Sequence, residues 1–409
     1  MGRGETAYVS PCRRSVVEDI LMELTYLDHA ATSWPKPRAV GRAMLAAMTE
    51  AGGNPGRAGH PLSMRASSVV YRTRETAADF FGLALPENVL FFPNATYAIN
   101  AVLHGLPLAE KHILCSELEH NAVIRPLHTL QKTDGIACGI YPVFGAGNGM
   151  LSEEEILSGI RARLTRNTAL VCACHVSNVC GARLPIAKIG ALCRAAQIPF
   201  LVDASQSAGV YDIDMARDSV DYLCCAGHKA LLGPQGSGLL LIGEGARLPV
   251  SSVQGGNGVA SLSAEMPDFL PEALEAGTLS VPAIAGLDAG ITHVRQVGCE
   301  EIRHTCHALY RRLLEMLDAL PGVTVYRGGI QEGCVLSFNV SGMACTDCAA
   351  RLADEGICVR AGFHCTPLPH RAFGTTESGC VRVSVGYGTT LRDTERFYRV
   401  MRDICREMR

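Results

Sequence analysis

Residues 200–207 read FLVDASQS, and residues 222–229 read YLCCAGHK. Each stretch starts with apolar residues and ends in a charged side chain, Asp203 in the first and Lys229 in the second. Uninterrupted short apolar runs are typical of strands that helices cover on both faces. Further runs of this kind, separated by segments with helical spacing, lie at residues 89–92, 112–115, 140–144, 170–176 and 238–242. This alternation predicts an α/β fold with a largely parallel sheet between helices.

The C-terminal part has a different pattern. A helical stretch is expected from Ala283 to about Leu320, where Pro321 and Gly322 form a stop signal. The expected elements beyond it are strands at 323–326, 335–340 and 381–385 and a helix at 346–355. They indicate a small α+β domain. We therefore expect a large domain at 36–290 and a small domain formed by 1–35 and 291–409, with 1–21 as a short helix or a poorly ordered extension.

The composition excludes several classes of protein. The chain has 409 residues, 48% of them hydrophobic, and a net charge of −3, which disfavours a disordered chain and a binder of nucleic acid through bulk positive charge. No apolar run is long enough to span a membrane, and the N-terminus has no signal-peptide core. Cysteines lie within apolar runs, as free thiols do in a reducing compartment, so we expect a cytoplasmic protein.

Two cysteine spacings resemble parts of metal sites. These are Cys345-x-x-Cys348 and Cys172-x-Cys174-His175. Neither has a second ligand pair at the spacing of a zinc site. We therefore expect buried or loop thiols and no metal.

The positions of Asp203 and Lys229 point to an organic cofactor. Both follow predicted strands, and ligands of α/β folds bind beyond the carboxyl ends of strands. A buried lysine is a nucleophile for carbonyl groups, and a carboxylate can pair with a protonated ring nitrogen. Pyridoxal 5'-phosphate (PLP) requires this combination. The alternative for each residue alone is a helix cap for Asp203 and a structural charge for Lys229.

The sequence resembles a known family over nearly its whole length. It is similar to the class V aminotransferase group of PLP fold-type I enzymes, in particular to cysteine desulfurases and selenocysteine lyases of the type II (SufS-like) branch. The resemblance implies a large PLP-binding domain with a mostly parallel seven-stranded sheet and a smaller α+β domain. The motifs that carry it are YLDHAAT (26–32), NPGRAGHPLS (54–63), SELEHNAVIRP (116–126), VSNVCGARLPI (176–186), LVDASQS (201–207), AGHK (226–229), EAGT (275–278), RAGFHC (360–365) and VRVSVGYGTT (381–390).

The resemblance implies roles in cofactor binding. Lys229 would carry the covalent link to PLP and move protons at the substrate, His120 would stack on the ring, and Asp203 would keep the ring nitrogen protonated. The other implied contacts are Ala95 and Thr96 at a helix start and His228 for the phosphate, Asn178 and Gln206 near the phenolic oxygen, and Thr278 for the phosphate of a neighbouring subunit. A homodimer follows from the last of these roles.

The resemblance also implies a substrate site. Arg382 would bind the substrate carboxylate with two hydrogen bonds, a pairing that suits arginine. Because a charge within a strand needs a partner, a salt bridge that joins the domains is the alternative role of Arg382. Arg57 and His60, in a glycine-rich loop, are weaker candidates for substrate contacts, and Asn178 is another.

Cys365 decides the reaction that we expect. A thiol in a loop beside an arginine and a histidine is suited to act as a nucleophile. The resemblance implies that Cys365 takes the sulfur of L-cysteine as a persulfide, releases L-alanine and passes the sulfur to an acceptor protein. Two residues depart from the SufS-like pattern, since Phe363 replaces a histidine and Ala226 replaces a serine, and residues 366–379 form a slightly longer loop. These departures indicate a divergent subfamily.

Other functions remain open at this point. Cysteine and selenocysteine present the same carboxylate and amine, so a selenocysteine lyase is an alternative. Another PLP-dependent lyase or aminotransferase would not need Cys365. A non-catalytic PLP-binding scaffold is a third possibility, although Lys229, Asp203, His120 and Arg382 are all in place. A nucleotide-binding Rossmann enzyme is disfavoured, because no G-x-G-x-x-G follows the first strand.

Overall fold

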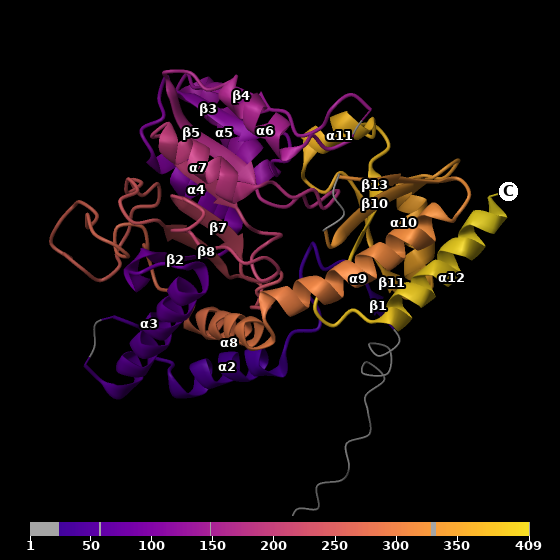
Figure 1. Cartoon of the computed structure of the whole chain (residues 1–409). Coiled ribbons are helices and arrows are strands. Elements are labelled where there is room, and N and C mark those ends of the chain that lie inside the picture. Colours follow the sequence, from indigo (N-terminus) through magenta and orange to yellow (C-terminus); the bar gives the residue numbers. More distant parts are fainter. Residues whose placement is uncertain (1–23, 57–58, 148, 329–332, 409) are drawn as a thin grey trace, which may run out of the picture.

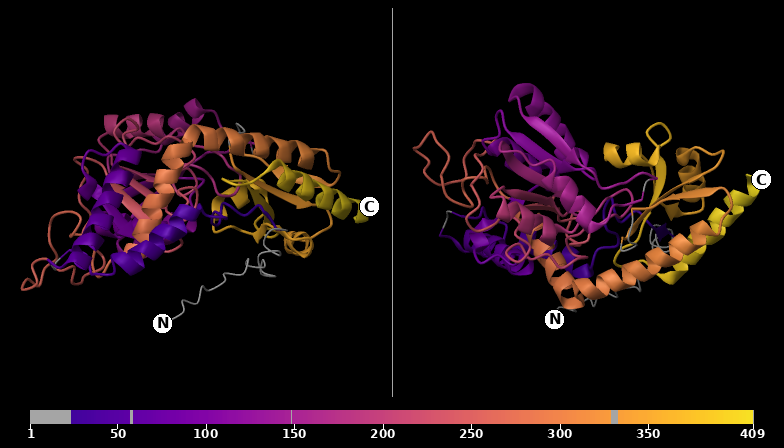
Figure 2. Two further views of the ribbon diagram at one scale, coloured as in Figure 1. Left: turned by 90° about the horizontal axis from the view of Figure 1, so that it is seen from below. Right: turned by 45° about the horizontal axis from the view of Figure 1, so that its top comes forward.

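The computed structural model describes residues 24–408 except 57–58, 148 and 329–332. A larger α/β part and a smaller part with its own sheet lie side by side, and helix α9 (Cys299–Asp318) runs from one to the other (Figures 1 and 2). The expected N-terminal extension at 1–21 and the candidate Arg57 lie outside the described residues. No helix in the described part is long and apolar enough to cross a membrane.

A seven-stranded sheet forms the centre of the larger part, in the order β2-β8-β7-β6-β5-β3-β4. Its strands are parallel except β8, which is antiparallel to both of its neighbours. The predicted α/β fold with a mostly parallel sheet is thus confirmed. The strands are β2 (Val89–Phe92), β3 (His112–Ser116), β4 (Ala137–Tyr141), β5 (Thr168–Cys174), β6 (Phe200–Asp203), β7 (Tyr222–Ala226) and β8 (Gly238–Ile242).

Alternate residues of the central strands face opposite layers of helices. In β5, Leu170 and Cys172 belong to a core cluster with α4 and α5, whereas Val171 and Ala173 belong to a second cluster with α6 and α7. Both faces are therefore apolar, which explains the uninterrupted apolar runs. The helices of the larger part are α2 (Arg38–Glu50), α3 (Pro61–Phe81), α4 (Ala95–Gly105), α5 (Asn121–Thr133), α6 (Glu153–Arg161), α7 (Ile186–Ala195) and α8 (Val281–Val297), with a short 3-10 helix at Pro86–Asn88.

Three predicted elements were wrong in their bounds by two residues or more, and the first of them, the strand expected at 170–176, is β5 at Thr168–Cys174. The strand expected at 140–144 is β4 at Ala137–Tyr141, because this edge strand is half-exposed and lacks a continuous apolar run. The apolar Val143 and Phe144 lie beyond it, where their backbone N–H groups donate to the Glu117 carboxylate. The single helical stretch expected from Ala283 is two helices, because Gly298 lies between α8 and α9 with φ +89°.

The smaller part is built on a four-stranded antiparallel sheet in the order β12-β13-β10-β9. Its core includes Phe338, Phe397 and Met401. The expected loop 366–379 contains a short helix, α11. The elements of this part are β9 (Val323–Tyr326), β10 (Val335–Val340), α10 (Cys345–Asp354), β12 (Arg360–Gly362), α11 (Pro367–Phe373), β13 (Cys380–Ser384) and α12 (Leu391–Glu407), with β1 (Thr25–Tyr26) paired to β11 (Ile357–Cys358).

Candidate active site

A cavity of about 170 Å³ lies at the carboxyl ends of β5, β6 and β7. This is the edge of the sheet at which α/β folds bind ligands. The structure brings most of the predicted cofactor residues together there. The lining residues are Asn94, Ala95, Thr96, His120, Ala122, Cys174, Asn178, Asp203, Ser205, Gln206, Ala226, His228 and Lys229.

Lys229 follows β7 and lines this cavity. Desolvation by burial lowers the pKa of its amine, Arg382 acts in the same direction, and the Asp203 carboxylate opposes them. A lowered pKa increases the fraction of neutral amine, which is the form that attacks a carbonyl group. The position of Lys229 at the cavity and the lowered pKa of its amine both suit a nucleophile for carbonyl groups.

Asp203 is the last residue of β6 and is 5% exposed. Its Oδ1 accepts a hydrogen bond of 2.9 Å from the backbone N–H of Ser205. The buried Ser205 hydroxyl has no hydrogen-bond partner among the described residues, and it also lines the cavity. A buried carboxylate and a hydroxyl without a partner indicate a site built for a polar ligand.

The N-terminus of α4 lines the cavity and is suited to bind an anion. Ala95 and Thr96 open the helix, and the N-cap residue Asn94 accepts a hydrogen bond of 3.2 Å from Tyr97 N. Backbone N–H groups and the helix dipole at such an end attract phosphate. Asn94 was not among the predicted site residues, although an asparagine directly before a helix is a recognisable N-cap signal.

His228 lies beside this anion-binding region. Its Nδ1 is 3.1 Å from Thr32 Oγ1, and its carbonyl oxygen accepts a bond of 2.6 Å from Lys36 Nζ. Burial, together with Lys229 and Lys36, lowers the pKa of His228 to about 4, and burial lowers the pKa of Lys36 to about 8. A neutral imidazole at His228 can therefore donate or accept one hydrogen bond.

His120 is the N-cap of α5, and its Nδ1 accepts a bond of 3.1 Å from Ala122 N, which assigns the ring proton to Nε2. Burial lowers the pKa of His120. The preceding Glu119 is fully buried and accepts a bond of 2.7 Å from Cys174 N as well as bonds from Ser116. Burial raises the pKa of Glu119 to about 7. Through the bond from Cys174 N, Glu119 connects the His120 segment to β5. Glu119 was not among the predicted site residues.

Cys365 is the exposed cysteine of the described part of the chain. It follows His364, and both residues have positive φ angles, +57° for Cys365 and +50° for His364. The Cys365 carbonyl accepts a bond of 2.8 Å from Asn121 N, next to His120. The structure therefore docks the Cys365 loop of the smaller part onto the edge of the cavity.

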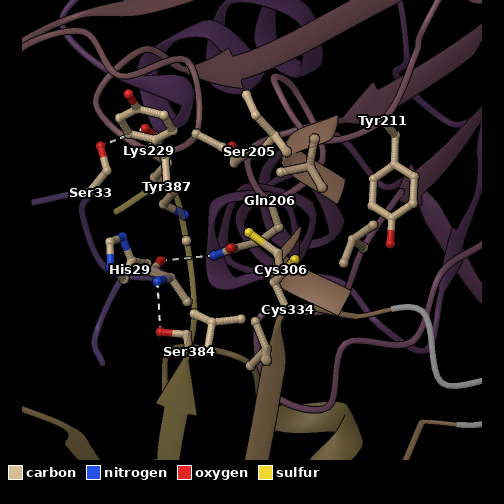
Figure 3. A pocket seen from close by; sticks show the side chains of 18 of the residues that line it. His29, Ser33, Ser205, Gln206, Tyr211, Lys229, Cys306, Cys334, Ser384 and Tyr387 are labelled. Atoms are coloured by element: carbon tan, nitrogen blue, oxygen red, sulfur yellow. Dashed lines mark hydrogen bonds between the residues drawn. The ribbon is translucent and has the colours of Figure 1, made fainter. Parts of the chain in front are cut away.

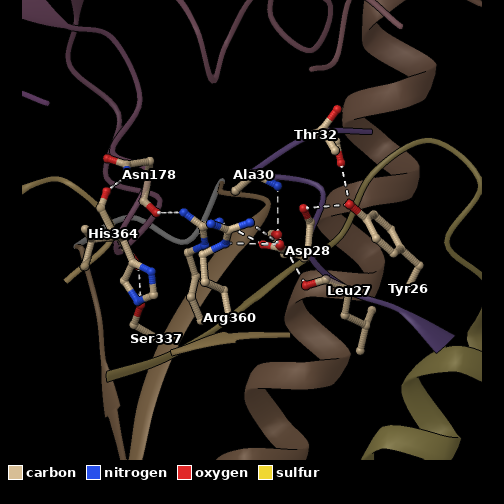
Figure 4. A network of polar contacts seen from close by, with 12 residues as sticks. Tyr26, Leu27, Asp28, Ala30, Thr32, Asn178, Ser337, Arg360 and His364 are labelled. Atoms are coloured by element: carbon tan, nitrogen blue, oxygen red, sulfur yellow. Dashed lines mark hydrogen bonds and ion pairs between the residues drawn. The ribbon is translucent and has the colours of Figure 1, made fainter. Parts of the chain in front are cut away.

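Asn178 lines the cavity, but its carboxamide forms hydrogen bonds with the Cys365 loop. Its Nδ2 donates to His364 O at 2.7 Å (Figure 4). Its Oδ1 accepts from Thr366 Oγ1 at 2.6 Å. The carboxamide expected to contact cofactor and substrate is therefore bonded through both its oxygen and its nitrogen to the Cys365 loop.

Arg382 lies in β13 and is 3% exposed. Its Nη2 is paired with Asp28 Oδ1 at 2.8 Å, and its Nη1 donates to Asn178 O at 3.2 Å. Asp28 also pairs with Arg360, which lies opposite Arg382 on the neighbouring strand β12 (Figure 4). Arg382 thus has a salt bridge, while its buried Nε has no partner among the described residues.

A second, apolar cavity of about 40 Å³ shares Ser205, Gln206 and Lys229 with the first (Figure 3). Gln206 Nε2 donates to Ala30 O at 2.9 Å, so this side chain is anchored between the two cavities. The thiols of Cys306 and Cys334 line the second cavity.

Two predicted site residues lie elsewhere. Thr278 lines a separate groove of about 550 Å³ together with Asn54, Tyr71 and Gly256. His60 is the exposed N-cap of α3, where its side chain accepts a bond of 3.3 Å from Ser63 N. Neither residue contacts the Lys229 cavity.

The sequence model of the aminotransferase class-V family matches residues 25–397. The chain belongs to this family. Family membership implies dependence on PLP, and the Lys229 cavity fits that cofactor, because it combines a half-buried amine, a buried carboxylate and a helix N-terminus.

Individual relatives of this class-V chain are similar over most of its length. It is 33% identical over 391 residues to a probable cysteine desulfurase of Mycolicibacterium paratuberculosis, an alignment of 93% of this chain and 55% of the relative. It is 29% identical to a probable cysteine desulfurase of Methanothermobacter thermautotrophicus, covering 94% of this chain and 96% of the relative. A solved cysteine desulfurase from Thermococcus onnurineus superimposes with a TM-score of 0.86 at 30% identity, covering 95% of this chain and 96% of that one.

Proposed function

We propose that this class-V protein is a PLP-dependent cysteine desulfurase. It converts L-cysteine to L-alanine, holds the sulfur as a persulfide on Cys365 and passes it to an acceptor protein. The observation that carries the proposal is the exposed Cys365 thiol on a loop docked beside the Lys229 cavity. The similarity to cysteine desulfurases supports the same reaction.

The residues of the cavity have separate roles in binding the cofactor and in moving protons. When bound, PLP stabilises negative charge at the substrate Cα. Asp203 would hold the ring nitrogen, His120 would lie against the ring, and the start of α4 with His228 would hold the phosphate. Lys229 Nζ, whose pKa is lowered by burial, removes the Cα proton and later returns a proton to the substrate.

Arg382 would bind the substrate carboxylate. Its salt bridge with Asp28 leaves the guanidinium charge fixed in place, and its buried Nε has no partner among the described residues. A guanidinium that is paired with one carboxylate can still bind a second carboxylate, because it has five N–H donors.

Cys365 performs the sulfur transfer. Its thiolate attacks the substrate sulfur, so that a new S–S bond forms as the bond from that sulfur to Cβ breaks. The electron pair of the broken bond passes to Cβ, which takes up the proton released when the Cys365 thiol ionised and becomes the methyl group of alanine. The persulfide is left on an exposed loop, where an acceptor thiol can reach it.

A homodimer is part of the proposal. Thr278 lies in its own groove away from the Lys229 cavity, so it can reach a phosphate only in another subunit. Two exposed apolar side chains, Tyr71 and Phe269, line that groove. Apolar exposure of this kind is typical of a subunit interface.

Release of alanine and sulfide from L-cysteine, with added thiol, tests the proposal on wild type and Cys365→Ala with the PLP absorbance recorded. We expect both products from wild type, and a variant that keeps its PLP absorbance but loses turnover. Equal activity of the variant would show that Cys365 is only a loop thiol and that the protein is another PLP-dependent lyase. A parallel assay with L-selenocysteine distinguishes a selenocysteine lyase.

A further inference from the structure

The loop that carries Cys365 is held at two points by one side chain. Asn178 is buried in the turn after β5, and its carboxamide bonds His364 O through Nδ2 and Thr366 Oγ1 through Oδ1. These two partners flank Cys365 on either side. The carboxamide therefore bridges the loop across the reactive residue.

Thr366 uses its hydroxyl in an unusual way. It is the N-cap of α11, a position where threonine normally caps the helix, yet its side chain makes no capping bond. An N-cap threonine often bonds the N–H of the third helical residue, but that residue here is Pro369, which has no N–H. The hydroxyl instead donates to Asn178 at 2.6 Å, and Thr366 is only 1% exposed. Its role therefore lies across the loop rather than within its own helix.

The backbone between these two contacts is strained. His364 and Cys365 both have left-handed φ angles, which side chains other than glycine seldom adopt. Such a conformation persists only where the surroundings fix it. Here the fixing contacts are the Asn178 carboxamide, the bond of 2.8 Å from Asn121 N to Cys365 O, and the contact of 3.1 Å between His364 Nε2 and Cys380 O.

The support for Asn178 is itself rigid. The Ser177 hydroxyl accepts bonds from Val179 N and Cys180 N, and Val179 O accepts a bond of 2.5 Å from the Ser337 hydroxyl of β10. The Asn178 carbonyl oxygen also accepts from Arg382 at 3.2 Å. One residue thus connects the Cys365 loop with the arginine expected to bind substrate.

We propose that the Thr366 hydroxyl and the Asn178 carboxamide form a clamp that holds Cys365 in its strained conformation, so that Thr366 is a positioning residue for the sulfur-accepting thiol. The catalytic part of this inference rests on the proposed function. The structural part does not, because it concerns the order of the loop in the folded chain.

Thr366→Val tests the clamp, since valine keeps the shape and removes the hydrogen bond. Hydrogen exchange read by mass spectrometry should be about 5- to 30-fold faster in a peptide spanning residues 360–373, the factor for one lost hydrogen bond. The kcat for desulfuration should fall by a similar factor, while KM for L-cysteine changes less than about 2-fold because Arg382 is untouched. Thr366→Ser keeps the hydroxyl and should restore both values.

Thr394→Val is the matched control. Thr394 is fully buried in α12, and its hydroxyl donates to Leu391 O at 2.7 Å, far from the loop. We expect Thr394→Val to have the same hydrogen exchange in residues 360–373 and the same kcat as wild type. Asn178→Asp is a second probe, because a carboxylate cannot donate to His364 O and should loosen the same peptide.

The outcomes separate cleanly. If Thr366→Val has the same exchange rates and the same kcat as wild type, the clamp is refuted. It is also refuted if hydrogen exchange is faster over the whole chain in both Thr366→Val and Asn178→Asp. If wild type has no desulfurase activity, the proposed function fails, while the exchange of residues 360–373 still decides whether the clamp exists.

Discussion

Removal of the Asp28 carboxylate is the sharpest perturbation that the structure offers. Asp28 pairs with Arg382 at 2.8 Å and with Arg360 at 3.0 Å, and these two arginines face each other across β12 and β13. The side chain of Asp28 is 12% exposed and that of Arg382 only 3%. Without Asp28, two like charges remain adjacent and one of them is buried.

The expected cost follows from that burial. Loss of one partner of a buried ion pair costs about 3–5 kcal/mol, so Asp28→Ala should lower the free energy of unfolding by that amount. Asp28→Asn keeps a neutral acceptor for Arg382, and a hydrogen bond to a charged group contributes about 1.5–3 kcal/mol. We therefore expect a smaller loss, about 2 kcal/mol, for Asp28→Asn.

Urea unfolding followed by circular dichroism measures both losses. Asp403→Asn is the matched control, because Asp403 pairs with Arg402 on the surface, where its side chain is 53% exposed. An exposed pair contributes about 0–1 kcal/mol. If Asp28→Ala is no less stable than Asp403→Asn, the Arg382 charge does not depend on Asp28 and the reasoning is refuted.

Two further predictions concern stability. Burial raises the pKa of Glu119 from 4.5 to about 7, so the stability of wild type relative to Glu119→Gln should be greatest below pH 4.5, fall as the pH rises to about 7 and then level off. The total fall, at about 1.4 kcal/mol per pH unit, is about 3 kcal/mol, and a pH-independent difference in urea titrations would contradict it. Gly298→Ala should destabilise by about 1–2 kcal/mol, because φ is +89° at the α8–α9 junction although no atom lies within 4 Å of an added Cβ. Gly41→Ala, inside α2 and equally open, should instead stabilise by about 1 kcal/mol, and equal thermal shifts of the two variants would rule out backbone strain as the cause.

Local chain properties explain which parts of the fold could be predicted. Apolar runs bounded by turn residues located the buried strands, since both faces of those strands are covered. The edge strand β4 was misplaced because one side of it is open to solvent, so its residues carry no continuous apolar pattern. The helix break at Gly298 was missed because helical spacing continues on both sides of it.

The candidate site divides in the same way. The sequence by itself determined that Asp203 and Lys229 each follow a buried strand and that Cys365 lies in a loop of the smaller part, because each position depends on a few adjacent residues. Only the tertiary structure decided that Asp28 meets Arg382 across 354 positions, that Asn178 grips the Cys365 loop, and that Thr278 lies in a separate groove. Contacts between segments so distant in the chain depend on how whole layers pack, and no local pattern of residues encodes that packing.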